Sequence, residues 1–128
     1  MPFIDTHAHV FLRSLPMVAN RRYTPGYDAS LASYIQMLTD NDVGCGVLIQ
    51  PSFLGTDNTY LLECLDRYPN ALRGVVVVAP DVSDEALDDM NQRGAVGIRF
   101  NMIGKDIAEM ATPESRALLA RIARLGWH

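Results

Sequence analysis

The chain has 128 residues, 48% of them hydrophobic and 20% charged, a composition that favours a soluble globular domain over a disordered segment. Its formal net charge is −4 and its basic residues are scattered, which argues against nucleic acid as a partner. No apolar run approaches the roughly 20 residues that cross a bilayer, and the N-terminus lacks the pattern of a signal peptide, so we expect one cytoplasmic domain over residues 1–128 with no membrane partner.

The first predicted strand covers residues 3–10 and is followed by a connection, 10–27, that is longer than a usual strand-to-helix loop. Loops of this length are often functional. The first predicted helix carries apolar side chains at helical spacing, namely Leu31, Tyr34, Ile35 and Leu38. We expect Asp28 to cap its N-terminus and Gly44 to follow its end.

Three further strand and helix pairs follow in the same order. Strands are predicted at 46–50, 72–79 and 95–101, where continuous apolar residues are typical of parallel strands buried on both faces. The second helix is predicted from an apolar stripe of Leu61, Cys64, Leu65 and Tyr68. The expected boundaries are Pro69 after the second helix, Ser83 and Gly94 around the third, and Thr112-Pro113 and Gly126 around the fourth.

This alternation of strands and helices predicts an α/β fold with a parallel sheet and right-handed crossovers. The last residues, Gly126-Trp127-His128, begin a new apolar segment that we interpret as the start of a fifth strand. An open sheet of this kind would expose the edge of the strand at 95–101. Association between copies, as a homo-oligomer, is therefore expected.

The segment Asp5-Thr6-His7-Ala8-His9 lies at the carboxyl end of the first predicted strand, which is the functional end of parallel sheets. Strand side chains alternate between faces, so Asp5, His7 and His9 are expected on one face. Two imidazoles spaced in this way can bind one divalent metal ion, with Asp5 orienting a histidine. The pattern alone leaves open a pair of hydrogen-bonded core histidines.

Gln50 and Ser52 stand at the end of the second predicted strand. Both side chains could hydrogen-bond a ligand at the same rim as the two histidines. The alternative is a turn in which Ser52 bonds to local backbone groups.

Arg99 and Asn101 follow the fourth predicted strand. An arginine among apolar residues needs an anionic partner, which could be a substrate carboxylate or a structural acid such as Asp81. Lys105 could reach the same site or lie in solvent.

Four segments of the chain stand in a characteristic order: FIDTHAHV at residues 3–10, LIQPSFLGTDN at 48–58, RGVVVVAPDVSD at 73–84 and GIRFNMIG at 97–104. Together they resemble the amidohydrolase-related family of TIM-barrel hydrolases, in particular its branch of pyrone-dicarboxylate and sugar lactonases. The resemblance implies that residues 1–128 form the N-terminal half of a (β/α)8 barrel, with four β-α units and the start of strand five. Such a barrel normally takes about 250 residues.

The resemblance also implies roles for individual residues. His7 and His9 correspond to a catalytic pair that binds a divalent metal in many members of the family, so the implied cofactor is a divalent metal such as Zn, or none. The implied substrate-binding residues are Tyr23, Ser52 and Arg99, with Lys105 standing where the pattern has another arginine. A further histidine and the aspartate that activates water would lie beyond residue 128.

We expect the complete enzyme to open a lactone or related cyclic ester that bears a carboxylate, a small-molecule substrate, by attack of water. The substrate's anion would be held by Arg99, Lys105, Tyr23 and Ser52, with Gln50 and Asn101 beside them, while His7 and His9 polarise the carbonyl. Two alternatives stay open: a metal-dependent decarboxylase of the same superfamily, and a catalytically silent α/β domain that binds a small anion. Residues 1–128 by themselves are expected to be inactive.

Overall fold

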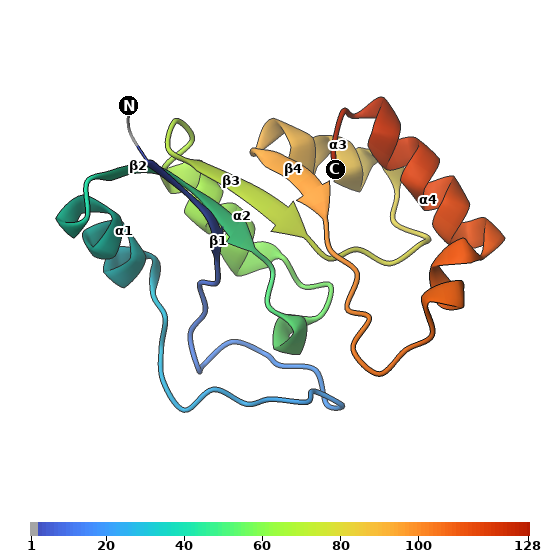
Figure 1. Ribbon diagram of the computed structural model, residues 1–128, viewed down its shortest axis with the longest axis horizontal. Coiled ribbons are helices and arrows are strands. Elements are labelled where there is room, and N and C mark those ends of the chain that lie inside the picture. Colours follow the sequence, from blue (N-terminus) through green and yellow to red (C-terminus); the bar gives the residue numbers. More distant parts are fainter. Residues whose placement is uncertain (1–2) are drawn as a thin grey trace.

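The computed structural model describes residues 3–128 and contains a parallel sheet with helices packed against it (Figure 1). The strands are β1 (Phe3–Ala8), β2 (Val43–Ile49), β3 (Leu72–Val76) and β4 (Ala95–Ile98). The helices are α1 (Leu31–Asp40), α2 (Thr59–Arg67), α3 (Asp84–Gln92) and α4 (Pro113–Arg124), with short 3-10 helices η1 (Ser52–Leu54) and η2 (Ile107–Ala111). The predicted series of four parallel β-α units is confirmed.

The strands pair in sequence order, β1-β2-β3-β4, and every pair is parallel. Because each crossover moves one strand further in the same direction, right-handed connections bring the helices to one face of the sheet. Helix α1 contacts β2, α2 contacts β3, and α3 contacts β4. The other face and the carboxyl ends of the strands are therefore free to carry polar side chains.

The backbone of His128 extends the sheet beyond β4. The amide of Ile98 donates to the carbonyl of His128 at 2.9 Å, and the amide of His128 donates to the carbonyl of Val96 at 3.1 Å. One residue that bonds to two alternate residues of its neighbour is the hydrogen-bond pattern of a parallel pair. The start of a fifth strand is thus in place, and the expectation of a free edge along residues 95–101 is wrong at this position.

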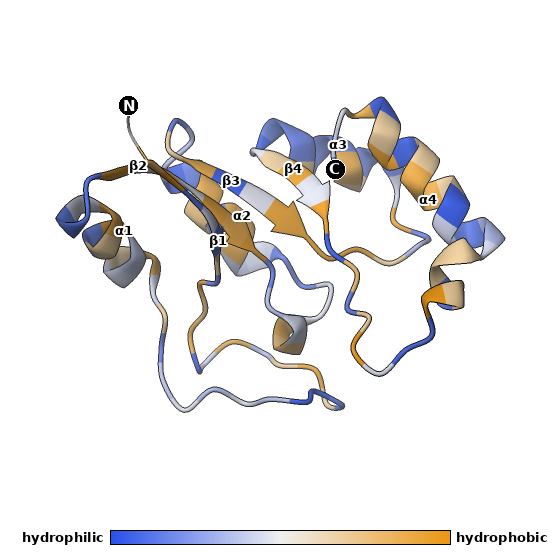
Figure 2. Ribbon diagram, viewed as in Figure 1, coloured by the Kyte–Doolittle hydropathy of each residue, from blue (hydrophilic) through white to orange (hydrophobic). Residues whose placement is uncertain are grey.

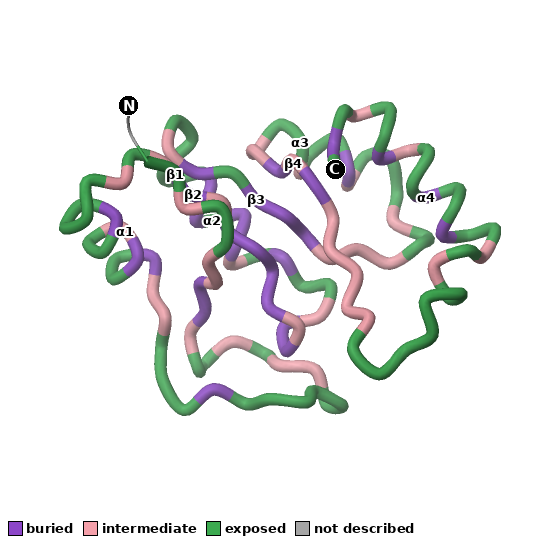
Figure 3. Tube along the Cα trace, in the orientation of Figure 1, coloured by how far each residue is buried: buried purple, intermediate pink, exposed green. Residues whose placement is uncertain are grey.

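Strand β1, at the other edge of the sheet, is more exposed than its apolar sequence predicts. The side chains of Phe3 and Ile4 are 73% and 60% exposed, whereas Leu48 of β2 and Val76 of β3 are fully buried. Figure 3 shows β3 mainly in the colour of buried residues and β1 without it. The predicted burial of β1 on both faces therefore does not occur, and within residues 3–128 this strand also has a partner strand on one side only.

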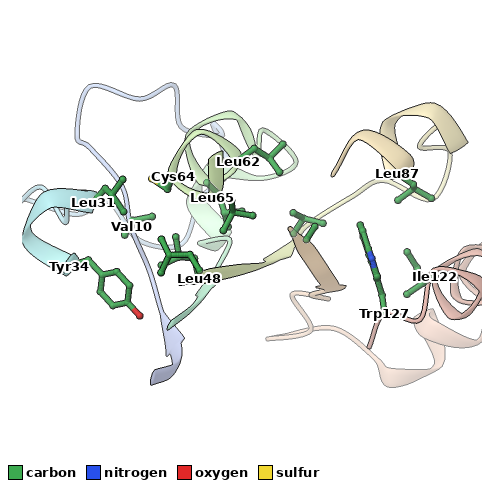
Figure 4. Close-up of a cluster of buried hydrophobic side chains, with 14 of the residues drawn as sticks. Val10, Leu31, Tyr34, Leu48, Leu62, Cys64, Leu65, Leu87, Ile122 and Trp127 are labelled. Atoms are coloured by element: carbon green, nitrogen blue, oxygen red, sulfur yellow. The ribbon is translucent and has the colours of Figure 1, made fainter. Parts of the chain in front are cut away.

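The main core lies where the helices meet the sheet (Figure 4). Leu48, Leu65 and Leu87 are almost wholly buried in it, and Figure 2 shows apolar residues along the strands and on parts of the helices, while the loops mix polar and apolar residues. Trp127 joins this core, and its indole Nε1 donates to the Oδ1 of Asn91 at 2.8 Å, which ties the end of α4 to α3. Within residues 3–128, no helix combines the length and the hydropathy needed to span a membrane.

Helices α3 and α4 begin and end as predicted. The hydroxyl of Ser83 accepts from the amide of Ala86, and that of Thr112 accepts from the amide of Ser115, so each side chain caps its helix. Glycines with φ of 101° and 72° follow the two helices at positions 94 and 126.

Helix α1 differs from the prediction at both ends. Ser30, not Asp28, caps it by accepting from the amide of Ser33, because the helix starts at residue 31. The carboxylate of Asp28 instead accepts from the amide of Arg13 at 2.7 Å. At the other end the chain turns at Asp42, with φ of 54°, a conformation that a short polar side chain tolerates, and Gly44 already belongs to β2.

Candidate functional site

A cavity of about 610 Å³ lies beyond the carboxyl ends of β2 and β4. Its size is within the usual range of small-molecule sites. Three segments line it, and they lie near one another at the lower end of the sheet in Figure 1. They contribute Val18, Asn20, Arg21 and Arg22 after β1, Ser52 and Gly55 at η1, and Arg99, Phe100, Asn101, Met102, Ile103 and Lys105 after β4. We call this cavity the basic pocket.

The structure brings four of the predicted substrate-binding residues to the basic pocket: Ser52, Arg99, Asn101 and Lys105. They come from two strand ends that are far apart in the sequence but meet because parallel strands end at the same edge of a sheet. The prediction that these side chains lie close together is supported by this geometry.

Arg99 has a backbone partner but no acidic one. Its guanidinium Nη1 donates to the carbonyl of Gln50 at 3.1 Å, and among residues 3–128 it forms no ion pair, so Asp81 is not its partner. The Oδ1 atom of Asn101, two residues on, is buried without a hydrogen-bond partner in the same described region. The pocket therefore holds a cation whose charge no acidic side chain within residues 3–128 neutralises.

Gln50 does not lie in the pocket as expected. Its side chain is fully buried, and its Nε2 donates to the carbonyls of Gly55 at 3.2 Å and Asp57 at 2.8 Å. This amide holds the turn that follows η1, while the backbone carbonyl of Gln50 holds Arg99. Gln50 thus supports two walls of the pocket and is not placed to contact a ligand with its side chain.

Tyr23 is also placed outside the pocket wall. Its side chain is 52% exposed, and its ring packs against Phe53 of η1 with a centroid separation of 6.2 Å. The structure therefore puts Tyr23 beside the element that carries Ser52 and not among the residues that line the cavity.

His7 and His9 form an edge-to-face pair with ring centroids 5.1 Å apart. The Nδ1 of His9 lies 2.7 Å from the carbonyl oxygen of Ile49, which can only accept, so Nδ1 carries the proton. Burial is the main reason why the pKa of His9 is lowered, and a weaker contribution comes from the charges of His7 and Arg99. A neutral His9 has a free lone pair on Nε2, which suits it to accept a proton or bind a cation.

Asp5 does not share the face of the histidines, contrary to the expectation from strand alternation. The register of the two strands is irregular here: Asp5 pairs with Gly46 and Ala8 pairs with Leu48, so β1 has one more residue than β2 between the two pairs. This bulge changes the direction in which the side chains of β1 point. The carboxylate of Asp5 accepts from the hydroxyl of Tyr34 on α1 at 3.0 Å. Asp5 therefore lies on the helix side of the sheet and does not orient a histidine ring.

The histidine pair supplies part of a metal site. A catalytic zinc usually has about three protein ligands, and within residues 3–128 no group of three or more His, Cys, Asp or Glu side chains could hold a metal ion. The free Nε2 of His9 fits a ligand role, but the remaining ligands would have to come from elsewhere.

Sequence reasoning did not select Arg21 and Arg22 as site residues, although both line the basic pocket. Two features of the sequence could have indicated these residues, namely the unusual length of the connection at 10–27 and the adjacent basic residues within it. Neither feature indicates where a loop folds, so only the tertiary structure shows that the two side chains line the same pocket as Arg99 and Lys105.

Residues 4–128 match the amidohydrolase family known as Amidohydro_2. The chain is 31% identical over 127 residues to a 2-pyrone-4,6-dicarboxylate hydrolase of Comamonas testosteroni, covering 98% of this chain and 41% of that protein. It is 34% identical over 98 residues to a 4-sulfomuconolactone hydrolase of Hydrogenophaga intermedia, covering 75% of this chain and 32% of that protein.

Solved structures agree with these relatives. The chain superimposes with a TM-score of 0.94 and 37% identity on a probable 2-pyrone-4,6-dicarboxylic acid hydrolase of Acinetobacter baumannii with citric acid bound, covering 100% of this chain and 48% of that one. A Pseudomonas putida protein described as a candidate for the same activity gives a TM-score of 0.87 and 47% identity, covering 98% of this chain and 46% of that one. The chain thus spans less than half the length of these relatives.

Proposed function

Because the chain belongs to the amidohydrolase family, we propose that the protein containing it hydrolyses a lactone that bears a carboxylate. The observation that carries this proposal is the basic pocket, which combines the cations of Arg99 and Lys105 with the hydrogen-bonding side chains of Ser52 and Asn101. Relatives named as hydrolases of a pyrone dicarboxylate and of a sulfomuconolactone support the same substrate class.

In this proposal the substrate's carboxylate binds to Arg99, with Lys105 as a second cation. The bond from Nη1 to the Gln50 carbonyl fixes the guanidinium, so its other N–H groups can point at the carboxylate. Ser52 and Asn101 offer further hydrogen bonds that orient the lactone ring. Binding in one orientation is itself a large contribution to catalysis.

The histidine pair is proposed to act on the water side of the reaction. The Nε2 lone pair of neutral His9 can accept a hydrogen bond from water, and His7 beside it can contact the lactone carbonyl. Water adds to the carbonyl carbon, the ring C–O bond breaks, and the ring oxygen takes up a proton to give a hydroxy acid. A divalent metal, if bound by these two nitrogens and by groups outside this chain, would supply Lewis-acid polarisation of that carbonyl.

The full-length protein tests this proposal with 2-pyrone-4,6-dicarboxylate and with a neutral lactone of the same ring size. Lactone opening releases a proton because it creates a carboxylic acid, so we expect acid production, measured in a pH-stat, together with loss of the lactone absorbance. Decarboxylation instead consumes a proton and releases CO2, and that outcome would contradict the proposal.

Two comparisons sharpen the test. The neutral lactone should be turned over at least about tenfold less efficiently, since a charge-assisted hydrogen bond contributes roughly 1.5–3 kcal/mol. Arg99→Gln should remove this preference, whereas Arg116→Gln, on the exposed surface of α4, should retain it. Equal turnover of both lactones by the unaltered protein would refute the carboxylate requirement. Residues 1–128 alone are proposed to lack turnover.

A further inference from the structure

The hydrogen-bond ladder between β2 and β3 ends one bond earlier than its register allows. The amide of Gln50 donates to the carbonyl of Val75 at 2.9 Å. In a parallel pair, a residue that donates in this way also accepts, through its own carbonyl, from the amide two residues further along the neighbouring strand, as His128 does beside β4. The register therefore assigns the carbonyl of Gln50 to the amide of Val77, but within residues 3–128 this bond does not form.

Asn58, which precedes α2 and is 4% exposed, takes the place of the missing strand partner. Its Oδ1 accepts from the amide of Val77 at 3.1 Å. Its Nδ2 donates to the carbonyl of Val77 at 2.8 Å and to the carbonyl of Thr56 at 3.0 Å. Carbonyls only accept and the amide of Val77 only donates, so these bonds fix the orientation of the Asn58 amide. One side chain thus bonds both backbone groups of Val77, which a longer β2 would otherwise have bonded.

The carbonyl of Gln50 is left free for a side chain, and Arg99 uses it. The guanidinium of Arg99 donates to this carbonyl at 3.1 Å, while the backbone amide of Arg99 donates to the carbonyl of Val76 at 2.8 Å. Without the side chain of Asn58, the partly buried amide of Val77 would lose its acceptor, which costs free energy. The acceptor that the register offers instead is the oxygen that Arg99 uses, so the two donors would compete for it.

Building on the proposed function, in which Arg99 binds the substrate's carboxylate, we propose that Asn58 is a positioning residue for Arg99. Asn58 holds the amide of Val77 and so reserves the carbonyl of Gln50 for the guanidinium. The N–H groups of Arg99 that remain for the ligand then have one preferred direction, because the guanidinium is planar and rigid. Asn58 does not line the basic pocket, so it acts on the substrate only through Arg99.

A double-mutant cycle in the full-length protein tests this inference, with citrate as a carboxylate ligand that contains no lactone. We expect Asn58→Ala to weaken citrate binding about fivefold in calorimetry, roughly the contribution of one neutral hydrogen bond. The KM for 2-pyrone-4,6-dicarboxylate should rise by a similar factor, with a smaller change in kcat. In an Arg99→Gln background the same substitution should change the Kd of citrate less than about 1.5-fold, because the group that Asn58 positions is absent. General destabilisation would instead act equally in both backgrounds.

Asn91→Ala is the matched control, because it removes an amide that accepts from the indole of Trp127 and does not line the basic pocket. It should lower stability and leave the Kd of citrate unchanged within about 1.5-fold. Asn58→Ser is a second variant for the case that Asn58→Ala does not fold. Serine suits the start of a helix, but its single hydroxyl cannot bond both backbone groups of Val77, so the loss of affinity should be the same.

The inference is overturned if the Asn58 variants leave the Kd of citrate unchanged, if their effect is equally large in the Arg99→Gln background, or if Asn91→Ala weakens citrate binding as much. These outcomes are separate from those of the proposed function. Coupling between Asn58 and Arg99 in citrate binding, in a protein that opens no lactone, would support the positioning role and contradict the hydrolase. Lactone turnover without such coupling would do the reverse.

Discussion

The guanidinium of Arg99, just after β4, donates a hydrogen bond of 3.1 Å to the backbone carbonyl of Gln50, just after β2. This bond passes over the end of β3 and connects the two strand ends that line the basic pocket. It fixes the position of one N–H group of the arginine and leaves the others for an anion. Because of this bond, we expect a substitution of Arg99 to impair substrate binding even when it keeps the positive charge.

Arg99→Lys is expected to raise the KM for a carboxylated lactone about tenfold in the full-length protein, because a single ammonium lacks the planar fork that can bond Gln50 and a carboxylate together. The kcat should fall less than the KM rises. Steady-state kinetics measures both, and Arg116→Lys on α4 serves as the control. An unchanged KM in Arg99→Lys would show that charge alone is sufficient.

Gly46→Ala is expected to lower the free energy of unfolding by about 1–3 kcal/mol. A Cβ atom at position 46 would lie only 2.1 Å from the hydroxyl of Tyr34, the same hydroxyl that donates to Asp5. Gly26→Ala is the control, since nothing lies within 4 Å of its added Cβ. Equal midpoints of the two variants in urea unfolding would show that α1 can move away from β2 at little cost.

Ser30→Ala is expected to lower stability by about 0.5–2 kcal/mol, because its hydroxyl accepts from the amide of Ser33 at the first turn of α1. Ser14→Ala, at an exposed position in the connection after β1, should change stability by less than about 0.5 kcal/mol. Thermal unfolding followed by circular dichroism compares the two. A larger loss of stability in Ser14→Ala than in Ser30→Ala would contradict the assignment of Ser30 as the N-cap of α1.

Asp66→Asn is expected to destabilise the protein near neutral pH but not in acid. Arg93 donates to both carboxylate oxygens of Asp66, the shortest contact being 2.7 Å, and lowers the pKa of that carboxyl below its ordinary 3.8. Stability from a lowered pKa is present above the ordinary value and is lost as the pH falls through the lowered one. Because the pair is largely exposed, the loss at about pH 7 should not exceed about 1 kcal/mol.

Unfolding at a series of pH values checks this prediction, and the difference in stability between Asp66→Asn and the unaltered protein should close as the pH falls through the lowered pKa of this carboxyl, below its ordinary 3.8. Asp88→Asn is the control, because Asp88 is exposed on α3 and forms no ion pair within the described residues. A difference that stays constant down to low pH would mean that hydrogen bonding and not charge holds Arg93.

Much of the fold followed from local patterns in the sequence. The helical stripes of α1 and α2, the caps at Ser83 and Thr112, and the apolar strands predicted four β-α units, because periodicity and capping depend on neighbours within a few residues. The motif order predicted the family, and residues 4–128 match it. The position of Ser52 and Arg99 at strand ends predicted that they would lie at the same rim of the sheet, and both line the basic pocket.

Other features depended on partners that no local pattern specifies. The irregular pairing of β1 with β2 moved Asp5 to the helix side, and packing of the turn after η1 buried the amide of Gln50. The path of a long connection brought Arg22 into the basic pocket. Sequence by itself determined which elements form and which residue types stand at their ends. Only the tertiary structure decided which side chains face one another, because register, burial and loop path arise from contacts between residues far apart in the chain.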